Sequence, residues 1–341
     1  MSAWAVFLSK GYHVFGATNS FPKRLLVRMS IIKRFVLLKG DRLNAIRRQL
    51  AMLIDQGVTL LSWKLTRLPK TPDFDGVPRI ALITVNFSTT YYLKLMLLTL
   101  CEQKQLGMIQ RIIIVDNDSR DGGKNFLRKL SNKVERIELV ERTSFLSHAG
   151  GLRAGITKLQ KIEPHLKSTQ QSNLLLICDT DIIFLNPDTL RILSDIIIKS
   201  NAALVGELRY GLHVYPDVQA SFFILRRDCY FQKNIVPFVN HGSPAYWMQR
   251  SLWKAGLRLE NFSSNFDGYI LHRGRSSVQA THTYRPNDAY ATTRNYFPHY
   301  MGVLNGKNVW MAIEKKYKNL LEIESEDGLI NYLYLKMTTL V

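Results

Sequence analysis

Short apolar runs alternate with helical patterns between residues 79 and 199, and this regular order constrains the fold more than any other feature. The runs that predict strands are residues 79–85, 111–115, 136–140 and 174–177, and a stretch with helical spacing follows each one. Strand and helix in regular alternation indicate a parallel sheet with right-handed crossovers. We therefore predict an α/β fold with a Rossmann-like, mostly parallel sheet flanked by helices.

The run at residues 173–187 (NLLLICDTDIIFLNP) leads into the acidic triplet Asp179-Thr180-Asp181. In open α/β sheets, ligands bind at the carboxyl ends of the strands. Side chains two positions apart on an extended chain point the same way, so Asp179 and Asp181 can converge on one cation. Two such carboxylates repel each other unless a positive charge lies between them, and a divalent metal supplies it. The alternative is an ordinary Asx turn at the end of a strand.

Two further polar turns follow predicted strands. Residues 115–122 (VDNDSRDG) place Asp116 and Asn117 where they could hydrogen-bond a base or a ribose, or could form an Asx-rich turn that caps the next helix. Residues 147–155 (SHAGGLRAG) open a helix whose N–H groups, dipole and Arg153 could bind a pyrophosphate. The alternative for these glycines is close packing of the helix against the sheet.

Taken together, four motifs resemble one family. ITVNF at 83–87, the turns at 115–122 and 147–155, and CDTDIIFLNP at 178–187 occur in the order and spacing of the family-two glycosyltransferases, which have the GT-A fold. This resemblance implies metal-dependent transfer of a sugar from a nucleotide-diphosphate sugar, commonly a UDP-sugar, to an acceptor hydroxyl. We predict inversion at the anomeric carbon, although the motifs alone leave inversion and retention open. The acceptor could be a saccharide, as in polysaccharide biosynthesis, a lipid-linked sugar or a protein.

Residue by residue, the resemblance implies a site. Asp179 and Asp181 would hold Mn²⁺ or Mg²⁺, and His272, in YILHRGRSS at 269–277, would complete the metal site as a distant histidine does in several related enzymes. An imidazole ligand favours manganese. Arg273 would neutralise the leaving diphosphate; the alternative is a structural histidine among solvated arginines. The positions assigned to donor binding are Val85, Asn86, Asp116, Asn117, Gly150, Arg153, Asp179 and Thr180.

The sequence departs from the family pattern in two places. The glycine turn usually carries an asparagine at each end, where this chain has His148 and Gly155. In the inverting members of the family, an acidic residue near the start of a late helix acts as base on the acceptor hydroxyl. Residues 241–247 (HGSPAYW) contain no such acid. We therefore predict His241 as the base, because imidazole titrates near neutral pH. Glu260 and Asp267 are possible substitutes, and the alternative for His241 is a polar surface residue.

Two other functions compete with this one. A sugar-1-phosphate nucleotidyltransferase would share the sheet but usually carries a glycine-rich G-x-G-T-R-like start, which ITVNFSTT lacks. A degenerate GT-A domain that binds a partner or a membrane would explain the missing acid. Nucleic acid is not expected as a partner, because the basic excess is not interleaved with an aromatic recognition motif.

The 341 residues carry a net charge of +19, and residues 1–79 hold 14 Lys or Arg against 4 Asp or Glu. We predict a basic amphipathic helical extension at 1–70, a linker at 71–78, a nucleotide-sugar-binding core at 79–230 and an acceptor-side part of the same domain at 231–341. Helical spacing at 24–38 and 45–63 would allow the extension to lie on an anionic membrane or to pack on the core.

Three widely separated cysteines argue against a disulfide framework and fit a reducing compartment. No signal-peptide pattern and no apolar window of about 18 residues is visible. These features predict a cytoplasmic location, with peripheral binding to the inner face of the membrane as an option that the basic segment allows.

Overall fold

The computed structural model describes residues 41–66, 68–69, 71–143, 147–209, 217–240, 243–277, 300, 302–322 and 326–338. The chain divides into two compact units, Met1–Ala51 and Met52–Val341. Of the first unit, the structure describes only the start of helix α3 (Asp41–Leu65), and the second unit contains the remainder of that helix and all other described elements. The predicted helix at 45–63 is confirmed, whereas the helix expected at 24–38 lies outside the described residues. The domain boundaries expected near residues 70 and 230 stay predictions.

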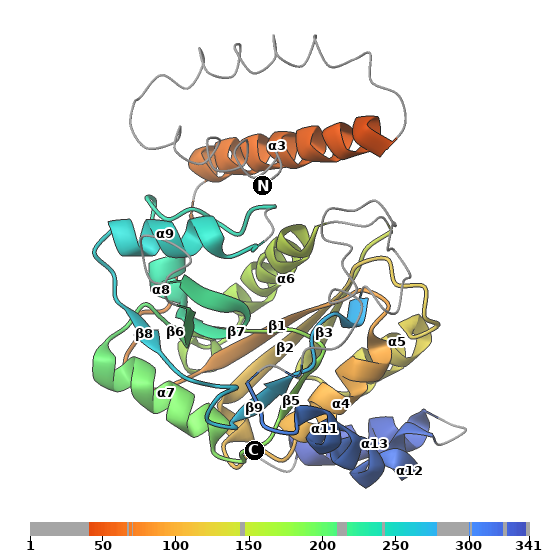
Figure 1. Ribbon diagram of the computed structural model, residues 1–341. Helices are drawn as coiled ribbons and strands as arrows, with labels where there is room; N and C mark the ends of the chain where they lie inside the picture. The colour runs from red at the N-terminus through yellow and green to blue at the C-terminus, as the bar shows by residue number, and fades with distance from the viewer. Residues whose placement is uncertain are drawn as a thin grey trace. The chain divides into compact units, whose positions relative to one another are not determined.

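A seven-stranded sheet forms the centre of the second unit, in the order β3-β2-β1-β4-β7-β6-β8 (Figure 1). Strands β3, β2, β1 and β4 are parallel, β7 is antiparallel to β4 and β6, and β8 is parallel to β6. The predicted α/β fold with a mostly parallel sheet is therefore confirmed. The strands are β1 Ile80–Asn86, β2 Ile109–Asp116, β3 Ile137–Glu141, β4 Leu174–Cys178, β6 Leu204–Arg209, β7 Asp217–Arg226 and β8 Leu259–Asn261.

Helices cover both faces of this sheet (Figure 1). Ile80 and Leu82 of β1 belong to one hydrophobic cluster, whereas Ala81 and Ile83 belong to another, because successive side chains of a strand point to opposite faces. Burial on both faces explains why the central strands are continuous apolar runs. The first cluster includes residues of α4 Thr90–Leu100, α5 Lys124–Lys133 and α7 Thr189–Ser200, and the second includes residues of α6 His148–Ile162, α8 Arg227–Tyr230 and α9 Tyr246–Lys254.

The C-terminal helices pack on the α4 and α5 side of the unit (Figure 1). Trp310 and Leu333 join the first hydrophobic cluster, and Lys94 of α4 forms an ion pair of 2.7 Å with Glu326. These helices are α11 Gly306–Lys316, α12 Lys318–Leu321 and α13 Asp327–Thr338, and short 3₁₀ turns occur at Leu106–Met108, Glu163–His165 and Ser168–Gln170.

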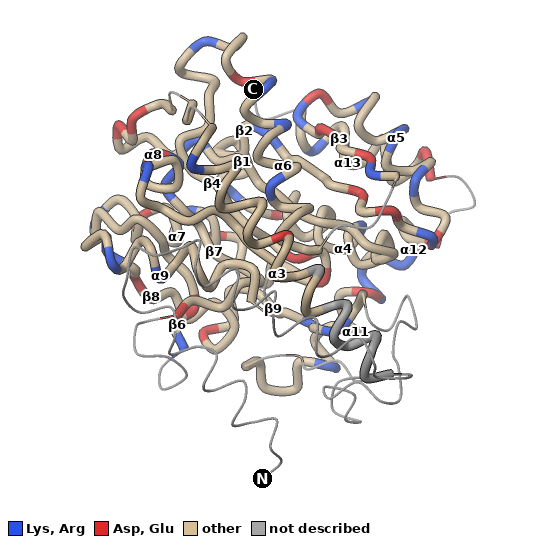
Figure 2. Tube along the Cα trace, turned by 90° about the horizontal axis from the view of Figure 1, so that it is seen from above, with Lys and Arg blue, Asp and Glu red and all other residues tan. Residues whose placement is uncertain are grey.

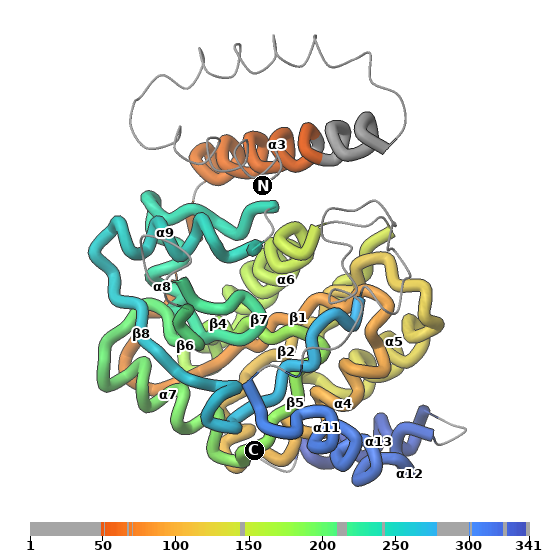
Figure 3. Tube along the Cα trace, in the orientation of Figure 1, coloured from red at the N-terminus to blue at the C-terminus, as the bar shows by residue number. Residues whose placement is uncertain are grey.

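A second, two-stranded sheet joins segments that lie far apart in sequence. Strand β5 (Ile182–Phe184) pairs antiparallel with β9 (Ile270–His272), and the partner of Ile182 is His272. Both strands are labelled in Figure 1, and Figure 3 shows the path of the same chain as a tube in the same orientation. The backbone N–H of Arg273 donates to the carbonyl of Asp181 at 3.0 Å, which extends the pairing by one residue. This register places the end of β9 beside the acidic triplet.

Within the described residues, no helix is both long enough and apolar enough to cross a membrane. Lys and Arg are interspersed with Asp and Glu over the described chain (Figure 2).

Candidate functional site

The acidic triplet lies where the central strand β4 ends. Every residue of β4 is buried, and β1 and β7 flank the strand, so Asp179 is the first side chain past the apolar run. The N–H of Asp179 donates to the Ser221 carbonyl of β7 at 2.8 Å, and the Thr180 hydroxyl lies 2.9 Å from that of Thr89. The triplet is therefore fixed at the carboxyl end of the parallel sheet, as predicted.

His272 lies between the two carboxylates of the triplet. Its Nε2 atom is 3.3 Å from Oδ1 of Asp181 and 3.9 Å from Oδ2 of Asp179. One possible ligand atom from each of Asp179, Asp181 and His272 lies within 4.8 Å of the other two. Among the described residues, no other group of three Asp, Glu, His or Cys side chains is placed to hold a metal ion. We call Asp179, Asp181 and His272 the acid–histidine cluster.

Hydrogen bonds from outside the cluster fix its orientation. Ser276 donates from its hydroxyl (2.7 Å) and from its backbone N–H (3.3 Å) to Oδ2 of Asp181. The amide Nε2 of Gln219 lies 3.3 Å from Nδ1 of His272, and the His272 N–H donates to Oδ1 of Asn265 at 3.1 Å. These contacts leave Nε2 of the imidazole facing the carboxylates, as a metal ligand requires.

The charges of the cluster depend on one another. Burial raises the pKa of Asp179, and the nearby His148 and His272 offset only part of that effect. Burial alone would also raise the pKa of Asp181, but the charge of His272 and the hydrogen bonds from His272 and Ser276 lower it to about 2. Burial would lower the pKa of His272, but Asp181, Asp179 and Glu207 raise it. For Asp181 and His272 the attraction between opposite charges outweighs burial, whereas for Asp179 burial outweighs that attraction.

This donor set fits a divalent cation. Two carboxylates and one imidazole converge, and both Asp181 and His272 have hydrogen-bonding partners on the side away from the common point. Oxygen ligands alone would suit Mg²⁺ or Ca²⁺, whereas the added imidazole shifts the preference towards Mn²⁺. Asp179, Asp181 and His272 are therefore the residues that could hold the metal.

His148 contacts this cluster from the opposite side, and the sequence analysis assigned it no role. Its Nε2 atom is 3.5 Å from Oδ1 of Asp179, whereas His272 faces Oδ2. Helix α6 begins at His148, and the Ser147 hydroxyl caps it by accepting from the Gly150 N–H at 3.2 Å. The signal in the sequence was the position of His148 at the start of a glycine-rich helix that follows a strand of the same sheet.

The glycines of this helix pack closely against β1. A Cβ atom on Gly151 would lie 2.7 Å from Cγ1 of Val85, and one on Gly155 would lie 2.8 Å from Cγ2 of Ile83. The packing alternative therefore accounts for these two glycines, and close packing brings the N-terminus of α6 to the carboxyl end of the sheet.

Asn86 and Asp116 form a second polar group at this end of the sheet. They are register partners at the ends of β1 and β2, and both are buried. The side-chain amide of Asn86 donates to Oδ1 of Asp116 at 3.2 Å and to the Ser119 hydroxyl at 3.1 Å. Lys124 Nζ lies 3.9 Å from Oδ2 of Asp116, and the N–H of Asn117 donates to the Asn86 carbonyl at 2.8 Å. The parallel register thus brings together three of the residues predicted to bind the donor.

The two predicted arginines have different surroundings. The Arg273 guanidinium lies 4.6 Å from the centre of the Tyr92 ring and donates to the Ser276 hydroxyl at 3.2 Å, so one serine links it to Asp181. Arg153 instead donates to the Phe238 carbonyl at 2.8 Å and to Asp55 of α3 at 3.3 Å. A role for Arg153 in binding a diphosphate stays a prediction.

The predicted base, His241, lies outside the described residues. Of its predicted substitutes, Glu260 is on the edge strand β8, where it forms an ion pair with Arg258, and the N–H of Asp267 donates to the Ser263 carbonyl at 2.9 Å. A buried carboxylate that was not predicted, Glu207, accepts hydrogen bonds from the backbone (2.7 Å) and side chain (3.1 Å) of Asn265. Glu207 therefore positions the residue that in turn holds His272.

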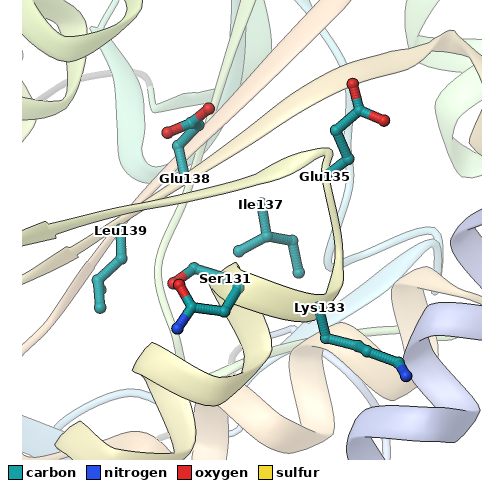
Figure 4. Close-up of a pocket in the computed structure, with 7 residues that line it drawn as sticks. Ser131, Lys133, Glu135, Ile137, Glu138 and Leu139 are labelled. Atoms are coloured by element: carbon teal, nitrogen blue, oxygen red, sulfur yellow. The ribbon is translucent and has the colours of Figure 1, made fainter.

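A pocket of about 490 Å³ lies elsewhere on the sheet (Figure 4). Its walls come from the end of α5 and the amino end of the edge strand β3, and include Lys133, Glu135 and Glu138. The acid–histidine cluster is at the carboxyl end of β4, so this pocket belongs to a different part of the molecule.

Comparisons with known proteins give only distant similarities. No protein-family model and no curated protein sequence matches the chain. Among solved structures, Staphylococcus aureus TarS 1-349 in complex with UDP-GlcNAc is 12% identical over 77% of this chain and 72% of that chain, with a TM-score of 0.43. In a longer TarS structure, the match spans 36% of that chain.

Two further similar structures contain manganese. The mannosyltransferase PcManGT from Pyrobaculum calidifontis, in complex with GDP-Man and Mn²⁺, is 14% identical over 87% of this chain and 84% of that chain, with a TM-score of 0.40. Glucosyl-3-phosphoglycerate synthase from Mycobacterium tuberculosis, in complex with Mn²⁺, UDP and glucosyl-3-phosphoglycerate, is 13% identical over 60% and 77%, with a TM-score of 0.41.

Proposed function

We propose that this protein is a glycosyltransferase that moves a sugar from a nucleotide-diphosphate sugar, with a UDP-sugar as the expected donor, to an acceptor hydroxyl. The single observation that carries this proposal is the acid–histidine cluster at the carboxyl end of β4, because its donor set suits a divalent cation. Its position agrees with the rule that ligands of open α/β sheets bind beyond the carboxyl ends of the strands.

The donor would occupy the carboxyl end of the sheet. Asp116 and Asn86 would bind the nucleoside there, since their carboxylate and amide groups offer acceptors and donors at the ends of neighbouring strands. Asp179, Asp181 and His272 would hold the metal. A bound cation would supply positive charge to the diphosphate and so stabilise the charge that develops on the leaving group.

Other residues of the chain would support the same charge change. Arg273 is a second positive charge beside the cluster, because Ser276 links it to Asp181. Charged donors that are held in place before the reaction stabilise the developing charge more than water does. His148 lies beside Oδ1 of Asp179, the oxygen that does not face His272, and would keep that carboxylate in place while the donor binds.

Transfer further requires a group that removes the proton of the acceptor hydroxyl. His241 remains our candidate, since a neutral imidazole can accept a proton near pH 7. The acceptor could be a saccharide, a lipid-linked sugar or a protein. It would contact residues 231–341, the part of the chain predicted to form the acceptor side. Inversion at the anomeric carbon follows if a single displacement by this hydroxyl takes place.

Donor binding and donor hydrolysis together test the proposal. A panel of UDP- and GDP-sugars is screened by thermal shift with and without Mn²⁺, because a ligand that binds the native state raises the melting temperature. We expect a shift that depends on both metal and nucleotide, and slow hydrolysis of the same donor. A shift without hydrolysis would favour a degenerate binding domain, and formation of a nucleotide sugar from a sugar 1-phosphate would favour a nucleotidyltransferase. Failure of every nucleotide to bind with Mn²⁺ would exclude the proposal.

A further inference from the structure

One face of helix α3 leaves apolar side chains in solvent. Ile54, Val58, Leu61 and Leu65 are 58 to 77% exposed, and their spacing of four, three and four residues places them on one side of the helix. We call these four residues the α3 stripe. Large aliphatic side chains at such exposures are ordinary when single, but four in a row form a continuous apolar surface.

The opposite side of the same helix is fastened to the core. Trp63 donates from its indole N–H to the Ile235 carbonyl at 2.8 Å, and its ring stacks on Phe231 at a centroid distance of 5.8 Å. Gln56 donates to the Asn240 carbonyl, and Asp55 accepts from Arg153 at 3.3 Å. Because these contacts fix the rotation of the helix about its axis, they also fix the direction in which the α3 stripe points.

Charge identifies the partner of this surface. Residues 1–40, which precede α3, contain seven Lys or Arg and no Asp or Glu, and residues 41–79 add seven more against four acids. Two of those acids, Asp55 and Asp75, are paired with Arg153 and Arg79. Aliphatic side chains on α3, in a chain whose first 79 residues are strongly basic, match a bilayer with anionic headgroups, which accepts apolar side chains and attracts Lys and Arg.

A second copy of the chain fits this surface less well. The stripe spans eleven residue steps, so it is about 16 Å long. Four side chains over this length offer less area than the roughly 800 Å² that each partner contributes to a stable interface. Two copies would also carry the same excess of Lys and Arg in residues 1–79, and like charges repel each other. A bilayer has neither restriction.

We propose that the α3 stripe docks this protein on the surface of an anionic membrane, with α3 lying in the plane of the headgroups. A helix in this plane inserts its apolar side chains into one leaflet only, so the attachment that we propose is peripheral. This inference goes beyond the proposed activity and does not depend on it, since no residue of the stripe belongs to the acid–histidine cluster.

Vesicle sedimentation of the full chain tests the inference. Vesicles of phosphatidylcholine alone are compared with vesicles that contain about 30% phosphatidylglycerol, at low and high salt. The double variant Val58→Gln/Leu61→Gln changes two exposed side chains and is compared with Leu304→Gln/Met311→Gln, which changes two exposed apolar residues elsewhere. We expect the wild type and the control pair to bind the anionic vesicles, and the α3 pair to bind at least about 10-fold more weakly.

Four results would overturn the inference: no binding of the wild type to anionic vesicles, equal binding to neutral ones, wild-type binding by the α3 pair, or an equal loss in the control pair. Sedimentation equilibrium without vesicles provides a separate check. A dimer of the wild type that the α3 pair converts to a monomer would show that a second copy covers the stripe. Equal melting temperatures of both double variants and the wild type exclude misfolding as the cause of a loss.

Discussion

Ser276 donates a hydrogen bond of 2.7 Å to Oδ2 of Asp181, while His272 lies 3.3 Å from Oδ1 of the same carboxylate. The two partners come from one short segment, β9 and the four residues after it, so a single piece of chain positions both side chains that contact Asp181. Pairing of β9 with β5 is what brings this segment to the triplet.

Removal of the Ser276 hydroxyl is expected to weaken metal binding without unfolding the protein. In Ser276→Ala, Asp181 loses a hydrogen bond that holds its carboxylate and also helps to keep its pKa low. Loss of such a supporting contact typically weakens metal affinity about 10-fold or more. Calorimetric titration with Mn²⁺ in the presence of UDP measures the effect, and Ser131→Ala, which removes an exposed hydroxyl of α5, is the control. Equal affinities of Ser276→Ala and wild type would show that the hydroxyl does not support the ligand.

His148 is expected to act on the donor complex through Asp179. Its imidazole lies 3.5 Å from the oxygen of Asp179 that does not face His272, so His148→Ala frees that oxygen and lets the carboxylate turn. We predict that His148→Ala weakens binding of the Mn²⁺–UDP complex about 3- to 10-fold, and that His148→Asn, which keeps a donor at this place, recovers part of the loss. His165→Ala, in the 3₁₀ turn after α6, is the control. An equal loss in the Asn variant would mean that hydrogen bonding to Asp179 is not the reason.

Close packing of α6 on β1 predicts a stability effect at one glycine. Gly151→Ala would place a methyl group 2.7 Å from the stiff, β-branched Val85. Overpacking of this kind costs about 1–3 kcal/mol, more than the gain of about 1 kcal/mol that alanine brings to a helix. Gly57→Ala in α3 is the matched control, because its methyl group would meet nothing within 4 Å and should stabilise the helix. Chemical denaturation measures the free energy of unfolding of both variants. A Gly151→Ala variant as stable as the wild type would contradict the close packing.

The three cysteines are expected to be unreactive in the folded protein. All are free and buried, and burial raises the pKa of Cys101 and of Cys229 to about 12 and that of Cys178 well above its usual value. Because only the thiolate attacks a disulfide reagent, the raised pKa values leave almost none of it at pH 8. A colorimetric thiol assay should detect no thiol in the native state and three in denaturant. Rapid reaction of one native thiol would show that its part of the core is open.

Most of the sheet and half of the site were predictable from sequence. Apolar runs define β1 to β4, and the rule that ligands bind at the carboxyl ends of strands pointed to Asp116, Asn117 and the acidic triplet. Asn86 was assigned from the resemblance to a family. Strands β5, β8 and β9 were not predicted, because three residues carry too little periodicity and their pairing depends on distant partners. Strand β6 was not predicted, because Gly206, Glu207 and Arg209 interrupt its apolar pattern. His272 came from the resemblance to a family, not from spacing.

The contacts that support the cluster could not be predicted in the same way. Gln219, Asn265 and Ser276 are ordinary polar residues in sequence, and only the pairing of β9 with β5 and the fold of the loop before β9 bring them to His272 and Asp181. Arg153 was assigned to a phosphate from its place in a glycine-rich turn, and its contacts with Phe238 and Asp55 could not be predicted from sequence. Its role in binding the donor stays a prediction.

Manganese binding at the acid–histidine cluster tests the central claim most directly. Free Mn²⁺ is followed by electron paramagnetic resonance during titration of the wild type, Asp181→Asn, His272→Ala and Asp195→Asn, the last of which removes only the charge of a partly exposed ion pair with Arg191. With UDP present, we predict that the wild type and Asp195→Asn bind one Mn²⁺ with equal affinity. His272→Ala should bind it at least about 10-fold more weakly, and Asp181→Asn about 100-fold more weakly. Mn²⁺ binding of wild-type strength in Asp181→Asn would contradict the account.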